Sequence, residues 1–308
     1  MQPSIEHRRL KAAFKAVCLL WSVGVGVAAP AAAQTSSGLP EVLRDMSQAG
    51  QMCRRDGTAN RPMSAYSLNQ AADMSCALPA SEASRLLERP DAVLVDTRGE
   101  AAFEQFHRPG ALRMGPESLR HKTYLRNKQI LLMGDGKAER ELYAACAMLK
   151  QQGFRDVRVL QGGMPTYVSQ KGLPLVGASV PSALTLATLD MAQAWAESQF
   201  THNVMVGVGS LRTGELLGAK AMTSNSPKAL TAVVEQQRRV SRTPVASVVL
   251  VSDAALSEDR FQAYARAIAP LPLLVYSRGH EPLAKYLQTQ KAVWDAHARG
   301  PKVPSCGL

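Results

Sequence analysis

The chain has 308 residues, 46% of them hydrophobic and 20% charged, which excludes an intrinsically disordered chain and suggests about two domains. The formal net charge is +11, but the basic residues are scattered and aromatic residues make up only 5% of the chain. Neither a nucleic-acid-binding stripe nor a base-stacking platform is indicated, so no nucleic-acid partner is expected.

The first 33 residues have the pattern of a secretory signal peptide. Arg8, Arg9, Lys11 and Lys15 precede the apolar block AVCLLWSVGVGVAA, and small residues follow up to Ala33. The block is short for a membrane span, so we expect cleavage and export, to a bacterial periplasm or medium. The alternative is an uncleaved anchor. No later stretch is long and apolar enough to cross a bilayer, and no stable membrane insertion is expected after cleavage.

Four cysteines follow this leader. Cys53 and Cys76 bracket a Ser-, Asn- and Met-rich segment within a predicted N-terminal extension, residues 34–79, and an oxidising compartment would permit a bridge between them. Cys306, in the tail, is a competing partner. Cys146 lies on the apolar face of a predicted helix, which indicates a buried, unreactive thiol. The Cys and His spacings match no zinc pattern, so no metal site is predicted.

Strand-like runs alternate with helical patterns from residue 80 onward. The apolar runs at 92–98, 129–134 and 157–163 are typical of buried strands, and helical patterns lie before or between them. This alternation predicts an α/β fold in which helices cover both faces of a parallel sheet.

The same order of patterns returns in the second half of the chain. Four later segments echo four earlier ones: NVMVGVG (203–209) echoes AVLVDTR, LLGAKAM (216–222) echoes RPGALRM, SVVLVSD (247–253) echoes QILLMGD, and LLVYSRGHEPLAKYL (273–287) echoes VRVLQGGMPTYVSQK. We therefore predict a duplication, with one domain at 80–175 and a second, with the C-terminal tail, at 176–308, joined by a Pro-containing linker.

The first copy resembles a rhodanese-like domain at its beginning. Asp96 and Arg98 match the family's D-x-R pair, and Glu104 or Glu100 matches its acidic position. The segment FHRPGA, with His107 and Gly110, matches the family's second block. The resemblance implies that Asp96 and Arg98 form a paired charge anchoring a loop and that His107 is structural.

The end of the first copy carries the family's closing signature. GFRDVRVLQGGMPTY (153–167) matches it, with the double glycine at Gly162 and Gly163 and with Tyr167 in place of the usual Trp. The second copy resembles the family only faintly, since Gly207 and Gly209 replace the D-x-R pair and Arg278-Gly279 replaces the double glycine. The resemblance implies two rhodanese-like domains, each a parallel sheet flanked by helices, the second strongly diverged.

In that family the turn after the QILLMG strand begins with a cysteine that accepts sulfane sulfur as a persulfide, and related phosphatases use the same cysteine. The matching position here is Gly134, or Gly136 if the loop is aligned from its helix, and in the second copy it is Ser252. Glycine has no side chain, and a serine cannot carry sulfane sulfur and needs a general base to attack anything. We therefore expect no catalytic residue at either loop.

Three functions follow from this pattern. The preferred one is a non-catalytic binding or scaffold module in the cell envelope, with a protein partner of unknown identity and no cofactor. The second is a thiosulfate sulfurtransferase or persulfide carrier that uses a non-standard cysteine such as Cys306. The third is an anion sensor in which Lys137 and Arg140 at a helix N-terminus hold the anion, although Asp135 and Glu139 oppose it and resemble ordinary acidic capping residues.

Overall fold

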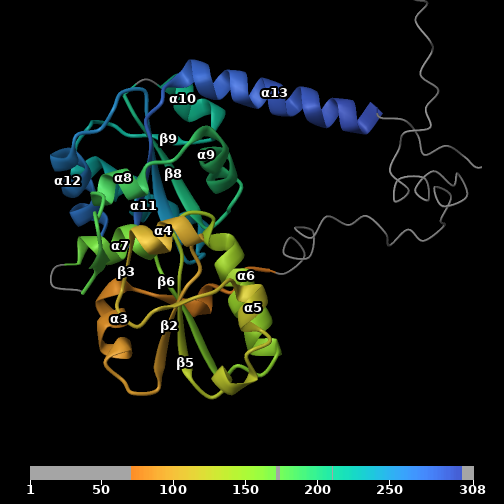
Figure 1. The fold of residues 1–308 in the computed structure, drawn as a ribbon. Coiled ribbons are helices and arrows are strands. Elements are labelled where there is room, and N and C mark those ends of the chain that lie inside the picture. Colours follow the sequence, from red (N-terminus) through yellow and green to blue (C-terminus); the bar gives the residue numbers. More distant parts are fainter. Residues whose placement is uncertain (1–70, 171–173, 210, 300–308) are drawn as a thin grey trace, which may run out of the picture. The chain divides into compact units, whose positions relative to one another are not determined.

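The computed structural model describes residues 71–170, 174–209 and 211–299, which form two parallel β-sheets flanked by helices (Figure 1). The predicted leader, most of the predicted extension and Cys53 and Cys306 lie outside the described residues. Among the described helices, none combines the length and apolar character needed to span a membrane. The predicted α/β class is confirmed.

The first sheet has the strand order β1-β6-β5-β2-β4, with all neighbours parallel. Its strands are β1 (Ala77–Leu78), β2 (Ala92–Asp96), β4 (Leu112–Arg113), β5 (Gln129–Met133) and β6 (Asp156–Leu160). Around it lie η3 (Met74–Cys76), α3 (Ala80–Leu87), α4 (Glu100–Gln105), α5 (Pro116–Leu119), η4 (Thr123–Leu125), α6 (Glu139–Gln151) and α7 (Gly163–Ser169). A separate antiparallel pair joins β3 (Phe106–His107) to β7 (Val176–Gly177).

The second sheet has the strand order β11-β10-β8-β9, again with parallel neighbours. Its strands are β8 (Asn203–Val208), β9 (Lys220–Ala221), β10 (Ser247–Ser252) and β11 (Leu273–Tyr276). Its helices are α8 (Ala183–Ala187), α9 (Met191–Ser198), α10 (Leu211–Leu216), α11 (Pro227–Ser241), α12 (Glu258–Ile268) and α13 (His280–Arg299).

The two sheets repeat one topology. Strands β2, β4, β5 and β6 of the first sheet correspond in order to β8, β9, β10 and β11 of the second. The registers agree as well: Asp96 lies opposite Arg113, and Gly207 lies opposite Ala221 at the equivalent step. An isolated parallel bridge from Thr188 to β11 takes the place of β1. The predicted echoes are therefore equivalent strands, while the exact domain boundaries stay a prediction.

Strand β5 shows why the first sheet needs helices on both faces. Its residues from Ile130 to Met133 are all buried, and successive side chains point to opposite faces. Ile130 and Leu132 belong to the cluster that contains Leu142 and Leu149 of α6. The alternate residues of the strand belong to a second cluster, with α3 and α7. Figure 1 shows α3 on one side of the sheet and α5 and α6 on the other.

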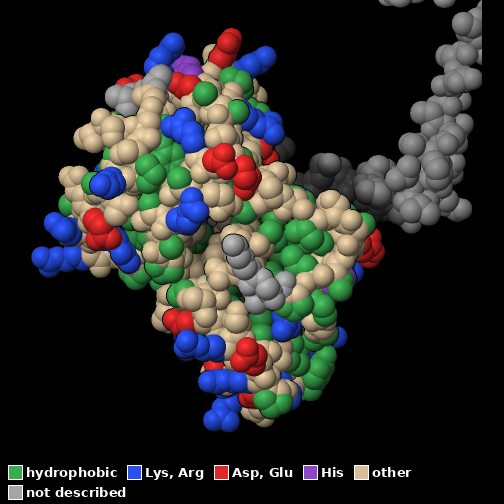
Figure 2. Space-filling model, turned by 90° about the vertical axis from the view of Figure 1, so that its left-hand side faces the viewer, with side chains coloured by type: hydrophobic (Ala, Val, Ile, Leu, Met, Phe, Trp, Pro, Cys, Tyr) green, Lys and Arg blue, Asp and Glu red, His purple; other side chains and the backbone are tan. Residues whose placement is uncertain are grey.

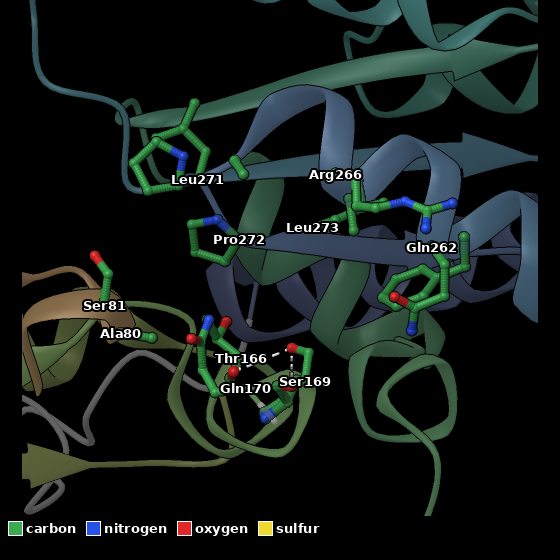
Figure 3. A pocket seen from close by; sticks show the side chains of 15 residues that line it. Ala80, Ser81, Thr166, Ser169, Gln170, Gln262, Arg266, Leu271, Pro272 and Leu273 are labelled. Carbon is green, nitrogen blue, oxygen red and sulfur yellow. Dashed lines mark hydrogen bonds between the residues drawn. The ribbon is translucent and has the colours of Figure 1, made fainter. Parts of the chain in front are cut away.

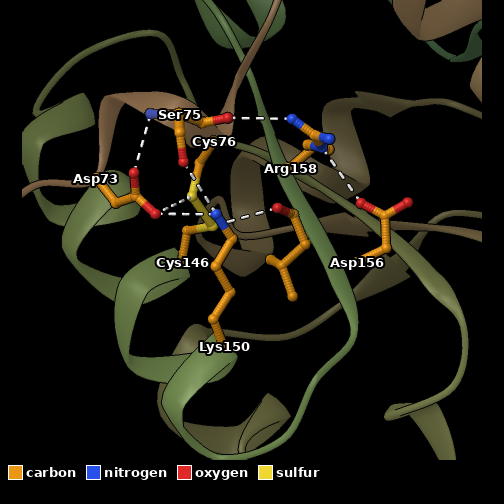
Figure 4. Close-up of a disulfide and its surroundings, with 8 residues drawn as sticks. Asp73, Ser75, Cys76, Cys146, Lys150, Asp156 and Arg158 are labelled. Carbon is orange, nitrogen blue, oxygen red and sulfur yellow. Dashed lines mark hydrogen bonds and ion pairs between the residues drawn. A yellow bond between two sulfur atoms is a disulfide. The ribbon is translucent and has the colours of Figure 1, made fainter.

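The disulfide differs from the prediction. Cys76 is bonded to Cys146, across a sequence separation of 70 residues and a Cα–Cα distance of 6.5 Å (Figure 4). The expected bridge from Cys76 to Cys53 is therefore wrong, and so is the free thiol expected at Cys146. Cys146 is fully buried, as its place on the apolar face of the helix predicted. It lies beneath η3, which packs on α6.

Polar contacts hold the bridged segment against the sheet. The Lys150 ammonium lies 2.9 Å from a carboxylate oxygen of Asp73, and the Arg158 guanidinium donates to the carbonyl of Ser75 at 3.0 Å (Figure 4). The disulfide thus lies within a network that fixes η3 and the edge strand β1.

The two sheets are joined by direct packing and hydrogen bonds. Phe200, just before β8, and Ala246, just before β10, belong to the core cluster under α6 of the first sheet. The buried side-chain amide of Gln161, after β6, donates to the carbonyls of Val245 at 3.0 Å and Ala246 at 2.7 Å.

Figure 2 shows Lys and Arg side chains dispersed over one face and interspersed with acidic ones, as the sequence indicated.

Candidate functional site

The loop from Gly134 to Ala138 connects β5 to α6, at the carboxyl end of the first sheet, where α/β folds commonly place their sites. Gly136 has φ = 80°, and a Cβ atom there would lie 2.6 Å from the carbonyl oxygen of Gly162. A Cβ atom at Gly134 would lie 2.8 Å from the side chain of Leu142. Gly136 therefore has no room for a side chain in this conformation, because the clash is with backbone, whereas a side chain at Gly134 would require only the end of the Leu142 side chain to shift.

The predicted double glycine packs against this loop. A Cβ atom at Gly163, which has φ = 48°, would lie 2.5 Å from both the carbonyl oxygen of Gly134 and the nitrogen of Gly136. The backbone N–H of Met164 donates to the carbonyl of Gly134 at 2.9 Å. The turn after β6 therefore contacts the loop through backbone atoms, which only glycine permits. Gly110, by contrast, occupies a turn where a Cβ atom would contact nothing.

Glu139, the first residue of α6, is buried with only 4% of its surface exposed. Its carboxyl accepts the Gly162 N–H at 2.6 Å and the Tyr143 hydroxyl at 3.1 Å. Burial raises the pKa of Glu139 from its ordinary value of 4.5 to about 8, against the two hydrogen bonds, and the negative charges of Glu197 and Asp135 raise it further. The reading of Glu139 as an ordinary capping residue is therefore wrong.

Glu197 reaches the same loop from α9, which belongs to the second half of the chain. It is also 4% exposed, and its carboxyl accepts the Ala138 N–H at 2.6 Å and the Asn203 amide at 2.6 Å. Asn203 in turn accepts a hydrogen bond from the Ser247 hydroxyl at 2.7 Å. Burial raises the pKa of Glu197, against the hydrogen bonds it accepts.

The basic residues of the loop do not converge on an open site. The Lys137 ammonium donates to the carbonyl of Thr188 at 2.8 Å, and the Arg140 side chain is exposed. The Ala138 N–H, which an anion at the start of α6 would use, already donates to Glu197. Binding of an anion by Lys137 and Arg140 stays a prediction.

The D-x-R pair lies immediately beside the loop, at the end of β2. Arg98 and Asp96 form a bidentate ion pair, 2.7 Å at its shortest, and both side chains are almost completely buried. Arg98 also donates to the carbonyl of Phe106 at 2.7 Å and lies over its ring. His107 stacks on Phe103 and bonds its carbonyl. Asp96, Arg98 and His107 therefore hold the chain around β3.

The loop, the double glycine beneath it and the buried D-x-R pair form one continuous arrangement, and the family model of the rhodanese-like domain matches residues 79–170. Residues 79–170 form a rhodanese-like domain. The match covers the first sheet from α3 to the end of α7.

Curated relatives of the rhodanese-like domain include two tRNA uridine(34) hydroxylases. The protein from Bacillus pumilus (strain SAFR-032) is 34% identical over 89 residues, and that from Bacillus velezensis is 32% identical over 89 residues. In both cases the match covers 26% of this chain and 27% of the relative, so the chain spans about a quarter of their length.

Solved structures with similarity include a rhodanese-like domain from Anabaena sp., at 24% identity and a TM-score of 0.30, covering 34% of this chain and 81% of that one. A thiosulfate sulfurtransferase from Pseudomonas aeruginosa, at 19% identity and a TM-score of 0.28, covers 68% of this chain and 42% of that one.

In the second half, Ser252 occupies the step equivalent to Gly134 of the rhodanese-like domain. Its hydroxyl donates to the carbonyl of Ala254 at 2.9 Å and accepts the N–H of the same residue at 3.3 Å. Only 6% of Ser252 is exposed. Both of these hydrogen bonds are to backbone, so the hydroxyl closes a turn.

A pocket of about 280 Å³ lies between the rhodanese-like domain and the second half (Figure 3). Thr166, in α7, and Gln170, directly after it, line the pocket on one side, and Gln262 and Arg266 line it from α12. Arg266 is the one charged residue among the fifteen that line it, so the pocket offers no acid–base pair. Among the residues that the structure describes, no group of three His, Cys, Asp or Glu side chains converges as a metal site.

Sequence reasoning missed the two buried carboxyls. Tyr143, four residues after Glu139, lies one helical turn away on the same face, and this spacing was the available signal. For Glu197 the signal was its place three residues after Ala194, which is also buried. Neither pattern identifies the N–H group that donates a hydrogen bond to each carboxyl.

Proposed function

We propose that this protein is a non-catalytic rhodanese-like protein of the cell envelope that acts as a binding or scaffold module. The observation that carries the proposal is that glycine occupies both loop positions that match the family's cysteine, and that a Cβ atom at Gly136 would lie 2.6 Å from the backbone oxygen of Gly162. Sulfur transfer of the family's kind needs a thiolate at the start of this loop.

The hydrogen bonds of the loop support the same proposal. A persulfide or thiolate at the start of α6 would be stabilised by backbone N–H groups and by the helix dipole. Here the Ala138 N–H donates to the Glu197 carboxyl instead. A buried acid in that place disfavours a second negative charge beside it.

Export is part of the proposal. The Cys76–Cys146 disulfide is typical of proteins that fold in an oxidising compartment, and the first 33 residues have the pattern of a leader for such a compartment. Peptide mapping of the protein from its native cell should give an N-terminus close to Gln34 in the periplasmic or secreted fraction. A cytoplasmic protein that retains Met1 would contradict this part of the proposal.

The rival function is sulfur carriage by a non-standard cysteine. The disulfide consumes Cys76 and Cys146, so a free thiol would have to come from Cys53 or Cys306, which lie outside the described residues. The hydroxylase activity is named for relatives of which this chain spans only about a quarter of the length.

The test is a sulfur-transfer assay on the purified protein. After incubation with thiosulfate, we expect no gain of one sulfur atom by intact mass spectrometry and no thiocyanate after addition of cyanide. A sulfur adduct that is present in the wild type and absent in a Cys53→Ala/Cys306→Ala variant would establish the rival. An adduct that persists in this variant would equally defeat the proposal, since it would require a sulfur acceptor elsewhere.

A further inference from the structure

Two buried acids meet where the two halves of the chain join. Glu139 begins α6 of the rhodanese-like domain, and Glu197 comes from α9 of the second half. Glu197 accepts the N–H of Ala138, the residue that directly precedes Glu139. The Glu197 carboxyl therefore lies near enough to Glu139 for its charge to raise the pKa of Glu139, and each residue is only 4% exposed.

Among the described residues, neither carboxyl is neutralised by an ion pair. Asp135, in the loop, adds a further negative charge that affects both. Lys137 is the nearby cation, and its charge lowers the pKa of Glu197, but its ammonium donates to the carbonyl of Thr188. The Tyr143 hydroxyl and the Asn203 amide, from α6 and β8, are neutral donors.

We propose that protons at Glu139 and Glu197 control the contact of α9 with the loop from Gly134 to Ala138: the contact is closed while one carboxyl is protonated and opens when both are ionised. Two buried negative charges without an ion-pair partner repel each other and lose hydration. Movement of α9 away from the loop returns Glu197 to water and relieves both costs. The proposal does not depend on whether the protein transfers sulfur.

The direction of the pH effect follows from the raised pKa of Glu139. Between its ordinary value of 4.5 and about 8, the closed form binds more protons than the open or unfolded form. The contact is therefore most stable at or below pH 4.5, and it weakens as the pH rises toward 8. One proton changes the opening equilibrium by at most about tenfold per pH unit.

The experiment is backbone hydrogen exchange of the purified protein between pH 6 and 9, corrected for the pH dependence of intrinsic exchange. In the wild type, we expect the protection of residues 134–139 and 191–198 to fall across this range. Glu139→Gln should remove the fall, because its amide oxygen accepts the Gly162 N–H and its amide nitrogen donates to Tyr143, as a protonated acid would. Glu141→Gln, on the exposed side of α6, is the matched control and should behave as the wild type.

Each result of this experiment either supports or overturns the proposal. A wild-type profile that is flat with pH overturns the proposal, as does a fall that persists in Glu139→Gln. A loss of pH dependence in Glu141→Gln would also overturn it, since the effect would then not arise from the buried pair. Glu197→Gln should likewise flatten the profile; if that variant does not fold, the comparison of wild type with Glu139→Gln still decides the question.

Discussion

At the scale of single residues, the conformation of the loop after β5 depends on glycine, which has no Cβ atom. Gly136 combines φ = 80° with a backbone oxygen 2.6 Å from the place of its missing Cβ. Gly153 has a similar φ of 88°, but a Cβ there would contact nothing within 4 Å. Substitutions at the two positions therefore distinguish the free-energy cost of the backbone conformation from the free-energy cost of the steric clash.

Introducing the family's nucleophile should therefore not restore activity. We expect Gly136→Cys to show no thiosulfate sulfurtransferase activity and to lose about 3 kcal/mol of unfolding free energy, from both backbone strain and clash. Gly153→Ala, the control, should lose about 1 kcal/mol, from strain alone. Urea denaturation measures both. A Gly136→Cys protein with wild-type stability and measurable turnover would show that the loop accommodates the side chain.

The Asp96–Arg98 pair allows a second prediction at this scale. Arg98→Met leaves a carboxylate buried without its partner, so we expect a loss of about 3–5 kcal/mol of unfolding free energy by urea denaturation. Arg120→Met, which breaks an exposed pair with Glu117, should cost less than about 1 kcal/mol. The double variant Asp96→Asn/Arg98→Met should recover part of the loss. Equal costs for the buried and exposed pairs would contradict this account.

At the scale of elements, the disulfide connects η3 to α6. It closes a loop that includes most of the first sheet, since 70 positions separate Cys76 from Cys146. Linking residues so far apart restricts the unfolded chain strongly. The edge strand β1, only two residues long, follows Cys76 directly and thereby gains an anchor that its own hydrogen bonds do not supply.

Removing the bridge should be costly. For a closed loop of this length, we expect Cys76→Ala/Cys146→Ala to lose about 4 kcal/mol of unfolding free energy in a denaturant titration. Non-reducing peptide mapping of the wild type should recover the Cys76–Cys146 peptide pair. Recovery of a Cys53–Cys76 pair instead would refute the connectivity.

At the scale of the whole molecule, the two halves share a core. Phe200 and Ala246 from the second half belong to the cluster beneath α6, and the Phe200 ring lies 6.4 Å from that of Tyr143. Such shared packing favours cooperative unfolding of both sheets, whereas domains that contact only through a polar surface unfold independently.

Gln161 provides the test of this coupling. Gln161→Leu removes both hydrogen bonds to the second half and leaves two buried carbonyls without that donor, so we expect a loss of about 1–3 kcal/mol. Calorimetry should show one transition for the wild type and a broader or divided transition for the variant. Gln151→Leu, exposed on α6, is the control and should unfold as the wild type. Two separate transitions in the wild type would contradict a shared core.

The sequence predicted the elements well because periodic burial is a local property. The all-apolar run in β5 and the stripe of Leu142, Cys146 and Leu149 in α6 each indicated their structure from neighbours in the chain. The order of the echoes predicted the repeated topology for the same reason. The motif glycines and the D-x-R pair were likewise recognisable, since each motif spans a few residues.

By itself, the sequence determined the α/β class, the rhodanese-like first domain, the repeated strand order and the lack of a cysteine at the loop. Only the tertiary structure decided that Cys76 pairs with Cys146 and that Glu197 reaches the loop beside Glu139. The physical reason is distance along the chain. The packing of distant elements determines which two cysteines form a disulfide and which N–H group donates to a buried carboxyl. No local pattern in the sequence encodes that packing.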